Sequence, residues 1–533
     1  MDQKNGIYFL IDSLRYDVIS DLEKLSNYLP NLYKIYKNSS LYHCVANSRS
    51  TQFVLPSIFT LSYPLDYGGY DTGIRNRPIS FVELLKSQNY YNMMISNSNQ
   101  IGVTNGYQRG FDKIKTTVDF KVLLEHRIAR TIKPRLLKNK DESFAVKELN
   151  LFFDELINGI EKYDKELWTE KLLKSNLKLA EGFKKEKKLL NLNPNVVIKK
   201  ILLIAQGNYY KFLGDKELNY VSIFFDKLVS GVLWRLRTKI NRLPKIFPFT
   251  WYGHISVRFN RFNKKVSNIF NDLNNRKEPF FVYFHLMDLH DNRDITDPVF
   301  FIRKFKFFFR WLIAKKKGLT NRSFNYDLSL LYIDELIKPI LDLAESEKFK
   351  NTVFLFTADH GSSIAHTPKR KKLESERFLE MYKEDLEVPV LILNDSIKAN
   401  LKKNPLIDSM DATAIFLSEM GISNLPDVFK GEQLKKRDYI VSEHAGRGSS
   451  DLLLNNLYFT LTKKEEKVFM ILEDKKLFAS AYFDLDNDPY ETRNLIMNSN
   501  YKDKIKNLID LVVEERKEII LKRGCEVIYP WMF

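Results

Sequence analysis

An adjacent aspartate and histidine, Asp359 and His360, directly follow an apolar, strand-forming run at 353–357. Apolar runs of this length that are bounded by glycine, here Gly361, are typical of strands buried on both faces of a parallel sheet. Ligands of such sheets bind outside the carboxyl ends of the strands. The pair is therefore placed where a metal ion or a substrate would be bound.

Two further strand-like runs also end in side chains that can do chemistry. The run at 6–11 is followed by Asp12, and the run at 279–286 contains His285 and is followed by His290. Taken alone, Asp12 fits a helix N-cap equally well, because Asp and Ser favour that position. Three strands that all end in titratable groups favour one shared site at the edge of a sheet.

A run of hydroxyl and amide residues precedes an apolar helical pattern at 53–60, and it contains Ser48, Ser50 and Thr51. Several of these residues are candidates for a helix N-terminus, where free backbone N–H groups and the helix dipole favour an anion. A hydroxyl group there, beside a divalent cation, can act as an activated nucleophile. The alternative is an ordinary capping residue.

The composition excludes several classes of protein. The chain is 44% hydrophobic and 13% aromatic, which excludes a wholly disordered protein. Its two cysteines, Cys44 and Cys525, lie far apart, so we expect neither a disulfide framework nor a cysteine zinc cluster. The net charge of +17 suits phosphorylated substrates or anionic membrane surfaces. The sequence shows no nucleic-acid-binding motif, so we expect no nucleic-acid partner.

We expect a cytoplasmic protein that is able to contact the inner membrane surface. The N-terminal residues run into a strand without a signal-peptide segment, and no apolar stretch approaches the ~20 residues that span a bilayer. The segment 300–317 mixes aromatic and basic residues, and a helix there either lies on a membrane surface or packs on the protein core. Its apolar face would contain Phe301, Phe305, Phe308, Leu312 and Ile313.

The pattern of predicted elements divides the chain into four parts. Strand and helix signals alternate over 1–117 and again over 277–445, which indicates an α/β core in two pieces. Between them, 118–276 has helical periodicity, many lysines and few glycines, so we expect a basic helical insertion. Residues 446–533 predict a small antiparallel sheet and a terminal helix.

The ordered set of motifs resembles the sulfatases and sulfatase-like phosphotransferases of the alkaline phosphatase superfamily. The likeness covers roughly 5–117 and 279–496, and the helical insertion has no counterpart in it. It implies an α/β fold with a central mixed sheet flanked by helices and a small C-terminal antiparallel sheet. The landmarks, in chain order, are Asp12-Ser13-Leu14-Arg15, Thr51 with Leu55-Pro56-Ser57, Gly110-Phe111-Asp112, His285 with His290, Asp359-His360-Gly361, Asp411-Ala412-Thr413 and Tyr482-Phe483-Asp484-Leu485.

The resemblance implies a divalent metal site. Its ligands would be Asp12, Asp359 and His360, with the side chain of the nucleophile Thr51 completing the set. Such a mixture of oxygen and nitrogen ligands is accepted by Zn²⁺, Mn²⁺ and Ca²⁺ alike.

The resemblance also implies a substrate pocket. His290 and His366 would be its histidines, and either is able to protonate a leaving alkoxide. His285 is a further candidate for substrate binding, with His444 behind it. Contacts to the transferred group are expected from Arg15, Arg49 and Ser50.

The nucleophile position departs from the sulfatase pattern. Sulfatases that form formylglycine carry Cys or Ser two residues before the motif proline, whereas Val54 stands there in this sequence. The phosphoethanolamine transferases of the superfamily instead place a threonine five residues before the proline, which is the spacing of Thr51 from Pro56. We therefore expect phosphoester transfer or hydrolysis through Thr51, with Ser50 and Ser48 as alternative nucleophiles.

Two other functions stay open at this point. One is hydrolysis of a sulfate ester by Ser50 or Thr51 without formylglycine. The other is a catalytically degenerate sulfatase fold that serves as a membrane-associated scaffold and binds no metal. For either enzyme, we expect the substrate to be a phosphorylated or sulfated glycan or lipid.

Overall fold

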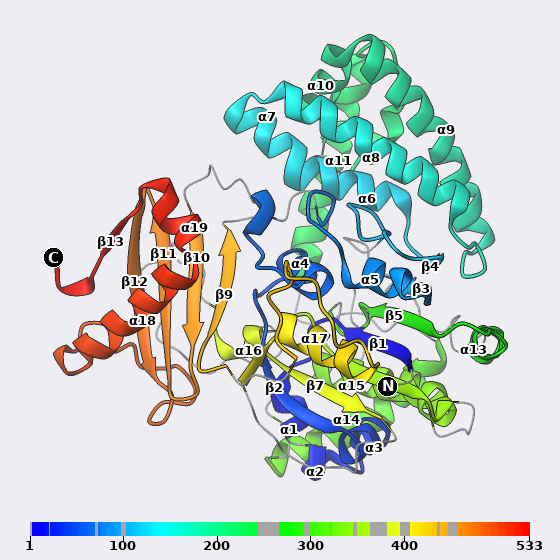
Figure 1. The fold of residues 1–533 in the computed structure, drawn as a ribbon. Coiled ribbons are helices and arrows are strands. Elements are labelled where there is room, and N and C mark those ends of the chain that lie inside the picture. Colours follow the sequence, from blue (N-terminus) through cyan, green and yellow to red (C-terminus); the bar gives the residue numbers. More distant parts are fainter. Residues whose placement is uncertain are drawn as a thin grey trace.

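Two β-sheets and a block of helices make up the protein (Figure 1). The larger sheet has eight strands in the order β4-β3-β5-β1-β6-β7-β2-β8, and the smaller has five in the order β13-β12-β11-β10-β9. The computed structural model describes residues 3–20, 22–69, 73–97, 103–205, 207–242, 266–290, 298–318, 320, 322–344, 349–362, 381–394, 406–433, 437–445 and 456–532.

The larger sheet is mixed, because β7 runs antiparallel to both of its neighbours while the other pairs are parallel. Together with the separate small sheet, this confirms the predicted α/β fold class of a central mixed sheet flanked by helices. Its strands are β1 (Asn5–Ile11), β2 (Ser40–Val45), β3 (Tyr91–Ser96), β4 (Lys113–Thr116), β5 (Phe280–Leu286), β6 (Thr352–Thr357), β7 (Glu387–Leu393) and β8 (Leu406–Asp408).

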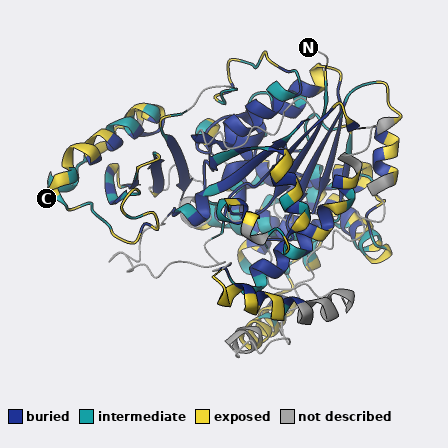
Figure 2. Ribbon diagram, turned by 90° about the horizontal axis from the view of Figure 1, so that it is seen from below, coloured by how far each residue is buried: buried dark blue, intermediate teal, exposed yellow. Residues whose placement is uncertain are grey.

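Strand β1 lies at the centre of the sheet, between β5 and β6, and pairs in parallel with both. The ring of Phe9 stacks between those of Phe284 and Phe356, at centroid distances of 4.3 Å and 4.9 Å. All side chains of β5 and β6 are buried, which explains why most of their residues are apolar (Figure 2). Three runs far apart in the sequence thus form one continuous core.

Helices cover both faces of this sheet. On one face, Tyr8 and Tyr283 pack against Phe416 of α17 and Phe59 of α4. On the other, Phe284 stacks on Phe270 of α13. The helices of the α/β part are α1 (Tyr16–Ser20), α2 (Leu22–Leu25), α3 (Pro30–Asn38), α4 (Thr51–Thr60), α5 (Phe81–Ser87), α13 (Val266–Asn274), α14 (Pro298–Lys316), α15 (Phe324–Ala344), α16 (Lys383–Leu386) and α17 (Ser409–Glu419).

A block of helices follows β4 and lies at the top of Figure 1. The helices at 142–162 and 170–192 each begin at a side-chain cap. The Asp141 side chain accepts from the Phe144 N–H, and the Thr169 side chain accepts from the Leu172 N–H. The block consists of α6 (Phe120–Arg127), a π-helical turn (Ile128–Ile132), α7 (Lys133–Asn139), α8 (Glu142–Lys162), α9 (Glu170–Leu192), α10 (Pro194–Leu203) and α11 (Tyr220–Arg242).

Helix α14 forms where the sequence predicted an aromatic and basic helix, but its buried face differs from the predicted apolar face. Phe307, Trp311 and Ala314 are the buried residues, whereas Leu312 is 41% exposed and Ile313 is 56% exposed. Phe308 is half-buried, and the side chains of the other two predicted face residues, Phe301 and Phe305, lie outside the described residues. Among the described residues, no helix has the length and apolarity needed to cross a membrane.

The smaller sheet is antiparallel except for the pairing of β12 with β13. The smaller sheet begins at β9, upstream of the boundary expected at 446. The strand at 440–445, which the sequence analysis assigned to the α/β core, therefore belongs to the smaller sheet. Its elements are β9 (Ile440–Ala445), β10 (Leu457–Thr462), β11 (Glu466–Glu473), β12 (Lys476–Asp484), α18 (Lys502–Glu515), α19 (Lys517–Ile520) and β13 (Glu526–Ile528).

Candidate metal centre and nucleophile

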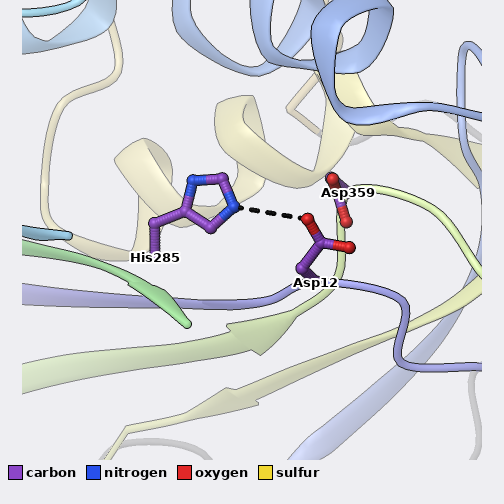
Figure 3. A group of neighbouring side chains, drawn as sticks. All are labelled: Asp12, His285 and Asp359. Atoms are coloured by element: carbon purple, nitrogen blue, oxygen red, sulfur yellow. Dashed lines mark ion pairs between the residues drawn. The ribbon is translucent and has the colours of Figure 1, made fainter. Parts of the chain in front are cut away.

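The carboxyl ends of the three central strands bring Asp12, His285 and Asp359 together (Figure 3). Asp12 directly follows β1, and Asp359 lies two residues after the end of β6. His285 is the second-last residue of β5. One ligand atom from each of the three lies within 4.8 Å of the others, and His285 Nε2 is 3.7 Å from Asp12 Oδ2. The parallel pairing of adjacent strands therefore builds a three-residue cluster able to hold a cation.

The cluster is buried and leaves polar atoms unsatisfied. Asp12, His285 and Asp359 are all 0% exposed. In the described part of the chain, neither ring nitrogen of His285 nor Asp359 Oδ2 has a hydrogen-bond partner. Each buried polar atom without a partner costs about 1–3 kcal/mol. His285 Nε2 and Asp359 Oδ2 fit a divalent cation, which would satisfy both of them at once.

The remaining oxygens of the cluster are oriented by short local contacts. Ser13 Oγ donates to Asp12 Oδ1 at 2.8 Å, and the backbone N–H of His360 donates to Asp359 Oδ1 at 2.9 Å. Burial alone would raise the pKa of the Asp12 carboxyl. The neighbouring histidines outweigh that effect and hold its pKa well below the usual range, so Asp12 is a carboxylate.

His360 lies next to the cluster, with its side chain oriented by the following residue. Its Nδ1 is 2.6 Å from the Gly361 carbonyl oxygen, which assigns the proton to Nδ1 and leaves Nε2 as the free acceptor. This Nε2 is 3.5 Å from Asp359 Oδ2 and 3.8 Å from Asp12 Oδ1. Nε2 is thus within reach of a cation bound between the two carboxylates.

Thr51 is the first residue of α4, and its hydroxyl points into the same cluster. Its Oγ1 donates to Asp12 Oδ2 at 3.0 Å and lies 3.3 Å from His360 Nε2. The preceding Ser50 has extended backbone angles and makes no side-chain cap, so the N-terminus of α4 stays available to an anion. Thr51 therefore lies beside Asp12 and His360, two of the metal ligands that the sequence predicted.

The predicted substrate residues lie around this centre in different settings. Arg15 donates to the carboxylate of Asp17 at 2.7 Å and 2.9 Å, and Arg49 lies 3.5 Å from Asp385. The ring centroid of His290 is 6.4 Å from that of His360. His366 lies outside the described residues.

Two placements differ from the sequence-based prediction. His285 was expected to bind substrate, but it lies inside β5 and faces the two carboxylates. The position of His285 within an otherwise apolar buried strand could have indicated this placement from the sequence. A histidine side chain is rarely buried without a hydrogen-bond or metal partner. The other difference concerns His444, which the sequence ranked behind the other histidines.

His444, in β9 of the smaller sheet, contacts residues at the start of α4. The N–H of Glu443 donates to the Asn47 carbonyl at 2.7 Å, which joins β9 to the segment before α4. His444 Nδ1 is 3.1 Å from Ser48 Oγ, and its ring packs 4.0 Å from that of Phe53. Burial, with further contributions from Arg49 and His360, lowers the pKa of His444 to about 3, so the ring is neutral. No sequence pattern links β9 to residues almost 400 positions upstream.

Comparison with known proteins finds similarity to sulfatases. The protein-family model described as Sulfatase matches residues 225–422, which include His285, Asp359 and His360. An arylsulfatase of Clostridium perfringens is 29% identical over 218 residues, which cover 38% of this chain and 42% of that protein. Arylsulfatase K of Bos taurus is 26% identical over 216 residues, covering 37% and 38%. The chain thus spans less than half the length of these relatives.

Solved structures match over nearly the whole chain. The yidJ protein of Bacteroides fragilis, named as a sulfatase, superposes with a TM-score of 0.57 at 14% identity and covers 97% of this chain and 98% of its own. A 2-O GAG sulfatase superposes with a TM-score of 0.51 at 13% identity, covering 97% and 93%. At such identities the likeness concerns the fold. The Sulfatase match over 225–422, the arylsulfatase relatives and the shared fold together show that this chain is similar to the sulfatases.

Proposed function

We propose that the protein is a divalent-metal-dependent enzyme that cleaves phosphate esters, by transfer or hydrolysis, with Thr51 as the nucleophile. The observation that carries this proposal is the position of Thr51 Oγ1, 3.0 Å from Asp12 Oδ2 at the N-terminus of α4. Asp12, Asp359 and His360 would hold the cation, with His285 facing it. When bound, a divalent cation would lower the pKa of a hydroxyl and stabilise negative charge on the transferring oxygens.

The residues of this chain supply the other parts of the reaction. Thr51 Oγ1 releases its proton to water and attacks phosphorus, while the bond from phosphorus to the leaving alkoxide breaks. The leaving alkoxide takes a proton from His290 or His366. Free N–H groups at the start of α4 stabilise charge on the transferred group. Water or an acceptor hydroxyl then attacks the phospho-threonine and restores Thr51.

The chemistry at position 54 favours phosphate over sulfate. Val54 cannot be converted to formylglycine, and it is completely buried in α4. A threonine ester of phosphate is released by a second in-line attack, which the same metal and helix N-terminus would assist. Thr51 is therefore suited to a double-displacement reaction without any modified residue.

Sulfate ester hydrolysis is the second candidate, and the arylsulfatase relatives favour it. One structural neighbour with a TM-score of 0.50 is a complex with a neocarrahexaose, and another is a 2-O GAG sulfatase. On either candidate, we infer a glycan or lipid substrate that carries a phosphate or sulfate ester. We also infer that the protein works in the cytoplasm, at the inner membrane surface.

Intact-protein mass spectrometry with two chromogenic esters tests both candidates. With bis(4-nitrophenyl) phosphate, the wild type should form a 4-nitrophenylphosphoryl adduct and release nitrophenolate, and Thr51→Ala should do neither. Ser57→Ala is the matched control, because it removes another buried hydroxyl from the same helix. An adduct that persists in Thr51→Ala refutes this nucleophile. Turnover of 4-nitrophenyl sulfate without turnover of the phosphodiester establishes the second candidate instead.

A further inference from the structure

Helix α11 exposes most of its apolar residues to solvent, and two of the three residues that face the protein are polar. The inward positions are Ile223, Asp226 and Ser230, which recur with helical spacing. Asp226 Oδ2 and Ser230 Oγ both accept from the side chain of Asn208, at 2.8 Å and 2.6 Å. The helix is therefore held to the protein largely through polar contacts, the reverse of an ordinary amphipathic surface helix.

The outward face is a continuous apolar strip. Phe224 is 62% exposed, Phe225 57%, Leu228 52% and Leu233 57%. Residues of this kind recur in pairs four positions apart, which places them on one side of the helix. An exposed apolar strip of this length marks a binding surface rather than a solvated face. Its members are Tyr220, Val221, Phe224, Phe225, Leu228, Val229, Val232, Leu233 and Leu236.

The charge of α11 selects the kind of partner. The helix contains one acidic residue, Asp226, whose Oδ1 pairs with Lys211 at 2.9 Å. Its basic residues are Lys227, Arg235, Arg237, Lys239 and Arg242. Two copies of this face would bring like charges together, in a chain that already carries +17. An anionic lipid surface complements both the apolar strip and the charge.

Helix α14 repeats this composition. Phe309 is 62% exposed and Ile313 56%, on the side opposite the buried Trp311. The basic residues Lys315, Lys316 and Lys317 close the helix and are exposed. Exposed aromatic and aliphatic side chains beside basic ones thus occur on two separate helices of this protein.

We propose that α11 binds the surface of an anionic lipid bilayer, with its axis parallel to the bilayer and the strip from Tyr220 to Leu236 inserted among the lipid headgroups. The helix is 23 residues long and would cover about 35 Å of membrane surface. Ester chemistry at Thr51 plays no part in this binding, which is therefore testable whether or not the proposed function holds.

Vesicle binding of the full chain tests the proposal. Sedimentation with phosphatidylcholine vesicles that contain phosphatidylglycerol should capture the protein, and capture by phosphatidylcholine alone should be at least tenfold weaker.

The triple variant Phe224→Ser, Phe225→Ser, Leu228→Ser should lower capture at least tenfold. Its matched control is Leu151→Ser, Leu177→Ser, Leu192→Ser, which changes leucines that are 43%, 49% and 74% exposed on α8 and α9. Both variants should keep the wild-type circular dichroism spectrum and hydrolysis of a soluble ester. Where the first triple variant fails to fold, Lys227→Glu with Arg235→Glu replaces it and should also lower capture tenfold.

Three results would overturn the proposal. One is equal capture of the wild type and both α11 variants by anionic vesicles. Another is no capture at all, together with a dimer in sedimentation velocity that the apolar α11 variant abolishes, which would assign the strip to a second copy of the chain. The third is equal capture by neutral and anionic vesicles.

Discussion

Asp359 Oδ2 and His285 Nε2 lie near Asp12 at the ends of different strands, and neither has a hydrogen-bond partner among the described residues. Replacing Asp359 by Asn removes one negative ligand and should abolish the binding of one equivalent of divalent cation. For a cation present at 100 times its dissociation constant, the lost binding lowers the free energy of unfolding by about 2.7 kcal/mol.

Metal analysis of the purified protein, with thermal unfolding before and after EDTA, checks this prediction. Asp427→Asn is the control, because Asp427 is exposed and does not belong to the cluster. A scaffold without catalytic function would bind no cation, so a wild type that purifies without metal and is indifferent to EDTA would contradict the proposed centre.

His444 and Ser48 contact each other beside α4, which carries the proposed nucleophile Thr51, and both lie outside the proposed metal cluster. Because the ring lies 3.1 Å from Ser48 Oγ and packs on Phe53, we expect His444→Ala to lower kcat about tenfold and leave KM unchanged. The ring is already neutral, so the pH profile above pH 5 should keep its wild-type shape. His43→Gln is a control for loss of a histidine elsewhere.

Double substitution separates positioning from general destabilisation. Ser48→Ala with His444→Ala should be no slower than His444→Ala alone, since both remove the same contact. Additive losses in kcat, or an altered pH profile, would show that His444 acts on the substrate directly.

At the scale of elements, the sequence predicted the central strands closely. The runs at 6–11, 279–286 and 353–357 correspond to β1, β5 and β6 within one residue at most ends. They are predictable because strands buried on both faces are apolar throughout and stop at a polar residue or glycine. The face of α14 was not predictable, because aromatic and basic residues alternate around it. Its inward face is fixed by tertiary contacts, such as the bond from Trp311 Nε1 to Asp327 Oδ2 at 3.2 Å.

Gly361 joins the Asp359-His360 pair to the segment of α16. A Cβ atom at this position would overlap the backbone carbonyl oxygen of Glu384, to which only glycine gives room. We expect Gly361→Ala to destabilise the fold by about 1–3 kcal/mol and to reduce cation binding, because the displaced backbone carries two of the ligands. Urea unfolding and metal titration measure the two effects.

The matched control for this substitution is Gly231→Ala in α11, where an added Cβ meets no neighbouring atom. Alanine should stabilise that helix by about 0.5–1 kcal/mol. Equal effects of the two substitutions would contradict the steric argument at Gly361.

At the scale of the whole molecule, Asp334 couples stability to pH. It is buried in α15, accepts from the Leu32 N–H at 2.7 Å, and burial raises its pKa to about 6 despite that bond. The folded state therefore holds a proton that the unfolded state releases near pH 4. This stabilisation is complete below pH 4 and is lost as the pH rises through 6, on the order of 3 kcal/mol in total.

Urea unfolding at pH 4, 5, 6 and 7 measures this dependence. Asp334→Asn should show a smaller loss of stability between pH 4 and 6 than the wild type, whereas Asp342→Asn, in the exposed last turn of the same helix, should match the wild type. Identical slopes in all three proteins would rule out Asp334 as the titrating group.

The assembly of the site was only partly predictable from the sequence. Asp12, Thr51, Asp359 and His360 were predicted from the order and spacing of motifs, and the fold places them together. The sheet order sets β1 between two strands that come from far along the chain, and this order fixed His285 as a neighbour of both carboxylates. The docking of β9 beside α4 depends on packing between two sheets, which leaves no periodic signature in either segment.

The arrangement of the centre also fixes when in the life of the chain a cation can be bound. Asp12 and Thr51 leave the ribosome early. Strands β5 and β6, which position His285 and Asp359, are synthesised long after β1. At ~5–20 residues per second, roughly 15 to 60 s separate the synthesis of Thr51 from that of Asp359. A nascent chain in that interval has two lone oxygen ligands and no sheet to orient them. Uptake of a cation by the proposed centre would therefore be a late step of biosynthesis, after the central sheet is complete.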